Sequence, residues 1–145
     1  MKEKELITTA IKASKNAFNP RRGSHGVGAA VLTKSGKIFP GTNVQSVISG
    51  LGTCAERCAI YNAVANGHDN IVALAVFFPS KKFTDPCGAC LQVMSEFSEV
   101  SGKDIKIIEI NQGKKTREKS TRQLLHHPLG PVELKWKVKK FRRRA

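Results

Sequence analysis

Two short cysteine motifs constrain the fold of this 145-residue chain more than any other feature: Thr53-Cys54-Ala55-Glu56-Arg57 and Pro86-Cys87-Gly88-Ala89-Cys90. Cys87 and Cys90 are three residues apart, so they face the same way on a first helical turn, and Cys54 is predicted to start another helix. If the two helix starts lie side by side, three thiolates converge and leave the fourth corner of a zinc tetrahedron open for water. The positive end of each helix also favours the thiolate form. The chain must therefore bring two distant helix starts together.

The residues around Cys54 favour a catalytic metal site. Two of them, Glu56 and Cys58, could instead have a purely structural role. Glu56 can move protons as a carboxylate that is not a ligand, but Thr53-x-x-Glu56 also matches a capping box, in which the carboxylate binds a backbone N–H. Three thiolates leave excess negative charge on a zinc dication, and Arg57 can offset it by donating to the sulfurs. Cys58 lies one helical turn after Cys54, so it is either a small buried hydrophobic residue or the fourth ligand of a closed zinc site.

Apolar periodicity and turn residues predict a mixed α/β domain. We expect helices over residues 3–18, 54–65, 86–97 and 120–126, and strands over residues 27–32, 38–43, 71–78 and 104–110. The uniformly apolar segment 71–78 suits a strand that is covered on both faces. An opening hairpin, followed by strands that alternate with helices, implies one mixed sheet with helices packed on it.

Length and composition indicate one domain that does not span a membrane. The 145 residues are 40% apolar, which is enough for a core, and no apolar run approaches the roughly 18 residues of a membrane span. The N-terminus lacks a secretory apolar region. Four cysteines without an export signal favour a reducing compartment, so we expect a cytoplasmic protein whose cysteines bind metal or take part in catalysis.

The net charge of +14 comes mostly from the C-terminal part of the chain. Residues 114–145 hold 12 of the 25 Lys and Arg residues but only 2 of the 11 acidic residues. Lys135 to Arg144 interleaves Trp136 and Phe141 with cations, a composition that can bind phosphates and stack on bases. One alternative is a solvated extension, because charge runs are usually solvated. Another follows from the strand-like alternation of Leu134, Trp136 and Val138, which suits a strand added to a sheet edge or to a neighbouring subunit.

The motifs, together with Val27-Gly28-Ala29-Ala30-Val31-Leu32 and with Asn43, eleven residues before Cys54, resemble the small homotetrameric cytidine deaminases. The resemblance extends from about residue 17 to residue 129. It implies a three-layer α-β-α sandwich around a mixed five-stranded sheet. Residues 1–134 would then form the catalytic domain and residues 135–145 the basic tail.

The resemblance also implies the chemistry of the site. Zn²⁺ would be bound by Cys54, Cys87 and Cys90, and Glu56 would shuttle protons while the 4-amino group of cytidine or 2′-deoxycytidine leaves as ammonia. The Ala55 backbone N–H would meet the pyrimidine carbonyl. Asn43 would bind the ribose, and neighbouring subunits would complete each active site.

The expected sugar pocket departs from the family pattern. The chain has His25 where the family usually has Phe, Gln45 where it has Glu, Ser49 where it has Tyr, and Leu129 where it has a C-terminal Phe. Gln45 keeps hydrogen-bonding ability without the charge-assisted bond to a ribose hydroxyl, and His25 can still stack on a base. Three other functions stay open: deamination of a modified cytosine nucleoside such as blasticidin S, deamination of cytosine in RNA or DNA through the basic tail, and a non-enzymatic, zinc-stapled domain that binds nucleic acid.

Overall fold

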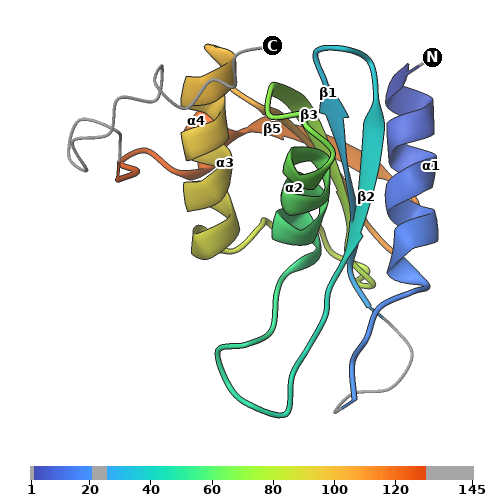
Figure 1. The fold of residues 1–145 in the computed structure, drawn as a ribbon. Coiled ribbons are helices and arrows are strands. Elements are labelled where there is room, and N and C mark those ends of the chain that lie inside the picture. Colours follow the sequence, from blue (N-terminus) through green and yellow to red (C-terminus); the bar gives the residue numbers. More distant parts are fainter. Residues whose placement is uncertain (1, 21–25, 130–145) are drawn as a thin grey trace.

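The sheet of this protein combines an opening hairpin, a parallel pair of strands and one further strand at the edge. The computed structural model describes residues 2–20 and 26–129. Five strands pair in the order β2-β1-β3-β4-β5: β1 (Gly28–Thr33), β2 (Ile38–Thr42), β3 (Ile71–Phe77), β4 (Lys106–Ile110) and β5 (Thr116–Ser120). The β3–β4 pair is parallel and the other pairs are antiparallel. The expected mixed five-stranded sheet is confirmed (Figure 1).

Helices cover both faces of this sheet: α1 (Lys2–Ser14), α2 (Ala55–Ala65), α3 (Gly88–Ser101) and the short α4 (Thr121–Leu124). Figure 1 shows α1 on one face and α2 with α3 on the other. Alternate side chains of β3 enter the two cores, Ala73 and Ala75 towards α1, and Leu74 and Val76 towards α2 and α3. Burial of β3 on both faces and the three-layer α-β-α sandwich are therefore confirmed.

Two glycines let the helices approach the sheet closely. A Cβ atom at Gly41 in β2 would lie 2.2 Å from the Ala59 nitrogen and 2.4 Å from the Ala55 oxygen of α2. A Cβ atom at Gly28 in β1 would lie 2.1 Å from the Ala10 oxygen of α1. Only a residue without a Cβ permits such contacts between backbones. The first turn of α2, which carries one cysteine motif, is therefore set against the sheet at a fixed distance.

The strand β5 was not predicted from the apolar pattern. Its five residues, Thr116–Ser120, are polar, and none of them is fully buried. The strand forms because its backbone pairs with β4, which places Arg117 opposite Glu109. An edge strand of this kind has one solvated face and needs no apolar alternation.

Some boundaries of the predicted elements also differ. The first helix ends at Ser14 rather than at residue 18, because Phe18 pairs with another segment. The Phe18 backbone N–H donates to the backbone oxygen of Asn43 at 3.1 Å, and the Phe18 backbone oxygen accepts from the Gln45 backbone N–H at 2.8 Å. The last helix ends at Leu124 rather than at residue 126. Long-range backbone pairing thus overrides the local helical pattern after residue 14.

Several predictions concern residues outside those that the structure describes. His25 and the basic tail, residues 135–145, both lie there. Within residues 2–20 and 26–129, no helix has the length and the apolar character needed to cross a bilayer.

Candidate metal centre and substrate pocket

Cysteines occupy the N-cap positions of α2 and α3. Cys54 precedes α2 and Cys87 precedes α3, and both have extended backbone angles. Their carbonyls accept the first helical hydrogen bonds at 3.0 Å, from the N–H groups of Cys58 and Leu91. Neither cysteine side chain forms a capping hydrogen bond. The two sulfurs are therefore available as ligands at the positive ends of two helices.

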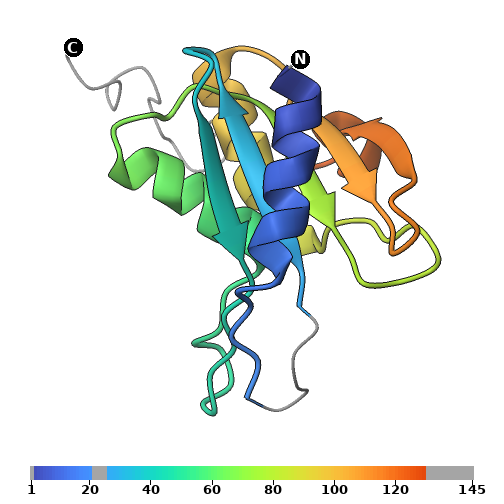
Figure 2. The same ribbon diagram turned by 90° about the vertical axis from the view of Figure 1, so that its right-hand side faces the viewer.

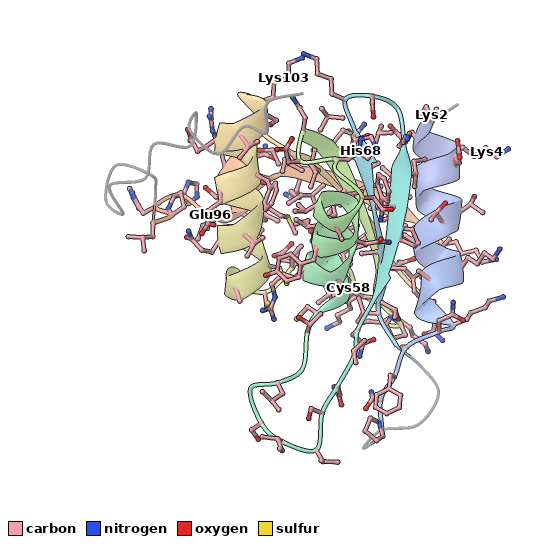
Figure 3. The ribbon with its side chains drawn as sticks, in the orientation of Figure 1. Lys2, Lys4, Cys58, His68, Glu96 and Lys103 are labelled. Carbon is pink, nitrogen blue, oxygen red and sulfur yellow. The ribbon has the colours of Figure 1, made fainter. Side chains whose placement is uncertain are left out.

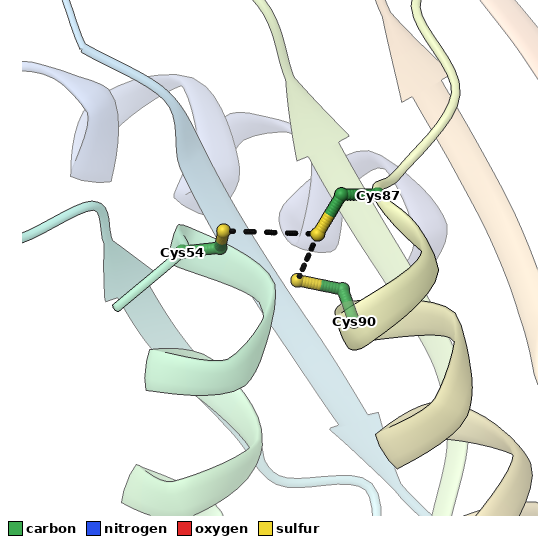
Figure 4. A group of neighbouring side chains, drawn as sticks. All are labelled: Cys54, Cys87 and Cys90. Atoms are coloured by element: carbon green, nitrogen blue, oxygen red, sulfur yellow. Dashed lines mark hydrogen bonds between the residues drawn. The ribbon is translucent and has the colours of Figure 1, made fainter. Parts of the chain in front are cut away.

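Three sulfurs converge between these helix starts (Figure 4). The Sγ atoms of Cys54 and Cys87 are 3.9 Å apart, those of Cys87 and Cys90 are 3.5 Å apart, and all three lie within 4.8 Å of one another. Tetrahedral zinc with bonds of about 2.3 Å to sulfur needs sulfur–sulfur separations of about 3.8 Å. The three side chains thus fit zinc as they stand, with Cys90 buried and Cys87 exposed.

The fourth cysteine does not join this group. Among the described residues, the sulfurs close enough to share a metal are those of Cys54, Cys87 and Cys90. Cys58, labelled on α2 in Figure 3, instead lines a separate hollow together with Thr9 and Lys12 of α1. It is half-buried rather than fully buried. The described residues therefore do not form the closed four-cysteine alternative.

Hydrogen bonds among the sulfurs and Arg57 favour negative charge at Cys54. The Cys90 thiol, helped by Arg57 and opposed by burial, lowers the pKa of Cys54 to about 5. The same hydrogen bond with Cys54, together with burial, raises the pKa of Cys90 well above its ordinary value. Arg57 Nη2 lies 3.7 Å from the Cys54 Sγ, which is the contact expected of a residue that offsets thiolate charge.

Glu56 is a buried carboxyl group at the same helix start. Its exposed fraction is 2%, and this burial raises its pKa to about 7, against the lowering effect of its own backbone N–H. The capping-box alternative is not formed, because the N-cap is Cys54 rather than Thr53 and Glu56 is the second helical residue. A carboxyl group with such a pKa can both accept and release a proton near neutral pH.

A cavity of about 480 Å³ is lined by Glu56, Cys54 and Cys87, among other residues. A backbone pair forms part of its rim: the Val44 and Thr53 N–H groups donate to each other's oxygens at 3.0 and 2.8 Å. This pair closes the base of the 45–52 loop, which projects beyond the end of the sheet (Figures 1 and 2). It thereby places the end of β2 beside the start of α2.

The pocket contains most of the residues that the sequence singled out. Asn43, Gln45, Ala55 and Arg57 line it together with Glu56. The Asn43 Oδ1 accepts a hydrogen bond of 2.8 Å from the Val27 backbone N–H, so this side chain is held in place. His25 cannot be placed, because it lies outside the described residues.

One wall of the pocket was not predicted. Phe78, Thr84 and Asp85, from the segment between β3 and α3, also line the cavity. The sequence held one indication of this wall: these residues precede the second cysteine motif, and the segment that leads into a metal ligand has to lie near the metal site. Their side chains alone match no catalytic pattern.

Comparison with known proteins agrees with this geometry. The family described as "Cytidine and deoxycytidylate deaminase zinc-binding region" matches residues 1–102. A cytidine deaminase of Halalkalibacterium halodurans is 40% identical over 103 residues, which cover 71% of this chain and 77% of that protein. A blasticidin-S deaminase of Bacillus cereus is 30% identical over 117 residues, covering 70% of this chain and 82% of that protein.

The fold also matches a solved structure. The crystal structure of cytidine deaminase from Burkholderia pseudomallei superposes with a TM-score of 0.80 at 35% sequence identity. The match covers 88% of this chain and 99% of that chain. The similarity therefore extends over the sheet and both helix layers.

Proposed function

The chain belongs to the cytidine and deoxycytidylate deaminase family, and from this premise we propose that Glu56 is the proton carrier of a zinc-dependent hydrolysis. The reaction converts cytidine or 2′-deoxycytidine and water to uridine or 2′-deoxyuridine and ammonia. The observation that supports the proposal most strongly is the position of Glu56, buried beside three convergent sulfurs and lining the same cavity.

Cys54, Cys87 and Cys90 would hold the zinc. When bound there, zinc would act as a Lewis acid and lower the pKa of a water molecule to about 7, which would make water a nucleophile near neutral pH. Arg57 donates to the Cys54 sulfur and so reduces the excess negative charge of three thiolates. Arg57 would in this way preserve the Lewis acidity that the three-cysteine site needs.

Glu56 then moves two protons. It accepts a first proton from the attacking water and delivers it to N3 of the pyrimidine. It then carries the second proton of that water from the new C4 hydroxyl to the 4-amino nitrogen, which leaves as ammonia. A pKa of about 7, raised mainly by burial, suits a group that has to be base and acid in turn. The Ala55 backbone N–H lies in the first turn of α2, where such groups lack helical partners, and it would hold the pyrimidine carbonyl.

Asn43 and Gln45 would hold the sugar. Because the Asn43 Oδ1 already accepts from the Val27 N–H, its amide NH₂ is the group that remains for a ribose hydroxyl. Gln45 can donate or accept but brings no charge, which weakens the selection of an unmodified ribose. His25 would stack on the base.

A cytosine nucleoside with a larger sugar substituent is the second candidate substrate. The neutral Gln45 favours it, as does the similarity to a protein named blasticidin-S deaminase. The relative named cytidine deaminase has the higher sequence identity, and the solved structure that matches the fold is also a cytidine deaminase. We therefore prefer free cytidine or deoxycytidine as the substrate.

We also infer a homotetramer that acts in cytoplasmic pyrimidine salvage. Val47, Ile48 and Leu51 are exposed on the projecting loop, and Phe18 is exposed beside its base, which supports coverage by a second copy of this chain. The metal needs reduced cysteines, and this supports a reducing compartment. Residues 1–134 would form the catalytic domain, and the basic tail, residues 135–145, would be an addition that could contact nucleic acid.

The decisive experiment measures ammonia release by the zinc-loaded protein from cytidine, 2′-deoxycytidine, blasticidin S and a short RNA. We expect turnover of the first two, and a loss of about 10²- to 10⁴-fold in Glu56→Gln with zinc content unchanged. Glu99→Gln, which changes an exposed carboxylate of α3, should retain full activity and is the matched control. Activity in Glu56→Gln equal to that of the parent would rule out the proton-carrier role.

A further inference from the structure

The wall of the pocket next to the second cysteine motif is held from two sides. The wall is the segment 79–86, whose Thr84 and Asp85 line the cavity. Its first half is hydrogen-bonded to the chain just after β4, through the side chain of Asn111 at 3.1 Å and the backbone of Gln112 at 2.8 Å. Its second half, which leads directly into the metal ligands, is held by the edge strand β5 instead.

Arg117 of β5 makes this second connection. Its Nη2 donates to the Asp85 Oδ1 at 2.8 Å, and its Nε donates to the Glu109 Oε2 at 2.6 Å. The guanidinium carbon lies 5.0 Å from the centre of the Phe83 ring, in a cation–π arrangement. One side chain thus contacts two residues of the wall and one residue of the central sheet.

Glu109 keeps the guanidinium in a fixed place. Its exposed fraction is 1%, and it lies opposite Arg117 across the β4–β5 pair. A buried carboxylate needs a cationic partner with good geometry, and the rigid planar fork of arginine donates to two carboxylates in fixed directions. Arg117 therefore holds Asp85, two residues before Cys87, at a fixed position relative to the sheet.

We propose that Arg117 is a positioning residue for deamination: by holding Asp85 and Phe83 against Glu109, it keeps the 79–86 wall in the place where the substrate pocket needs it. The inference rests on the proposed function, because it takes this cavity as the nucleoside site. Neither Arg117 nor Glu109 lines the cavity. Their effect is therefore on the shape of the wall and not on a reacting atom.

Lys106 provides a control for the loss of a cation that bridges two carboxylates. It also binds two carboxylates, Glu3 at 2.7 Å and Glu118 at 3.1 Å, and its side chain is 40% exposed against 37% for Arg117. Its partners lie on α1 and β5 and do not line the cavity. Lys106→Met and Arg117→Met thus each remove one cation from a pair of ion bridges, but only the second removes a contact with the wall.

The test compares the zinc-loaded parent, Arg117→Met, Arg117→Lys and Lys106→Met. In Arg117→Met we expect the KM for cytidine and the Kd for uridine, measured by calorimetry, to rise about tenfold, as for residues that support a metal site from outside. We expect kcat to stay within about threefold, zinc content to be unchanged, and amide hydrogen exchange to accelerate across residues 81–85. Arg117→Lys should recover part of the affinity, and Lys106→Met should behave as the parent.

Two results would overturn the proposal: uridine affinity and exchange at residues 81–85 that stay at parental values in Arg117→Met, or equal changes in Lys106→Met. If Arg117→Met does not fold, the same comparison is made with Arg117→Lys, for which an intermediate loss of affinity is expected and parental affinity counts against the proposal. A parent protein that does not deaminate cytidine would refute the proposed function instead, and the exchange measurement would still test the contact of Arg117 with the wall.

Discussion

Replacing Gly41 with alanine should disable the active site although Gly41 itself does not line it. Gly41 lies in β2, behind the first turn of α2, and the cavity is lined by other residues. The added Cβ would meet the Ala59 nitrogen at 2.2 Å and the Ala55 oxygen at 2.4 Å. Both are backbone atoms of the helix that carries Glu56, so neither can move away alone.

The size of the effect follows from these distances. Ordinary contacts of a Cβ atom begin at 3.4 Å, so the first turn of α2 has to move by roughly 1 Å, and a displacement of this size can reduce catalysis about 10²-fold. Overpacking costs about 1–3 kcal/mol in the free energy of unfolding. With an unfolding entropy of about 0.3 kcal/mol per degree for a domain of this length, Tm should fall by about 3–10 °C.

The assay measures kcat/KM for cytidine at a temperature well below Tm, together with Tm itself. Gly113→Ala is the matched control, because its Cβ would meet only the Asn111 Oδ1, at an ordinary 3.4 Å. This control should match the parent in both measurements. If Gly41→Ala keeps kcat/KM within about threefold of the parent, the close approach of β2 and α2 does not position Glu56, and the reasoning fails.

Three further predictions concern the metal, the core and the pH dependence of stability. Metal analysis should find zinc lost in Cys87→Ser but retained in Cys58→Ser, because only the first sulfur belongs to the convergent group; equal zinc loss in both would revive the four-cysteine site. Ile60→Ala, at a fully buried position, should lower the free energy of unfolding by about 2–5 kcal/mol, whereas Tyr61→Ala, at a side chain that is 46% exposed, should cost far less; denaturant titration checks both, and similar losses would contradict the packing. Burial raises the pKa of Glu109, so the folded state binds its proton more tightly than the unfolded state and loses stability as pH rises through the raised value. Glu109→Gln lacks this titration, so its stability relative to the parent should increase as pH rises above the ordinary pKa of a glutamate, and a relative decrease in unfolding titrations would show that the sign is wrong.

Much of the fold was accessible from local patterns, and the exceptions share one cause. The helices of the two cysteine motifs and four of the strands were predicted within a few residues, because apolar spacing and turn residues encode them. The fifth strand, Thr116–Ser120, carries no such pattern and exists through pairing with β4. The first helix ends early because Phe18 finds a backbone partner near residue 44. Pairing between distant segments cannot be predicted from the sequence of either segment alone.

The candidate site divides in the same way. Ligand type and spacing were enough to predict three metal-binding cysteines and a carboxylate beside them, because a cysteine pair three residues apart at a helix start already faces one direction. Sequence spacing could not decide whether Glu56 caps a helix or faces a pocket, since both uses share one pattern. The structure distinguishes them by making Cys54 the N-cap and burying Glu56.

The amino-acid sequence by itself determined the chemical groups that this protein brings together: soft ligands that suit zinc, a nearby carboxylate and helices that start at these cysteines. Only the tertiary structure decided how these groups are buried and which distant residues contact them. Folding buries Glu56 and thereby raises its pKa to about 7, and it brings Arg117 from the edge strand to the wall of the pocket. Burial and contacts between distant segments depend on how the layers pack, so no local stretch of residues specifies them.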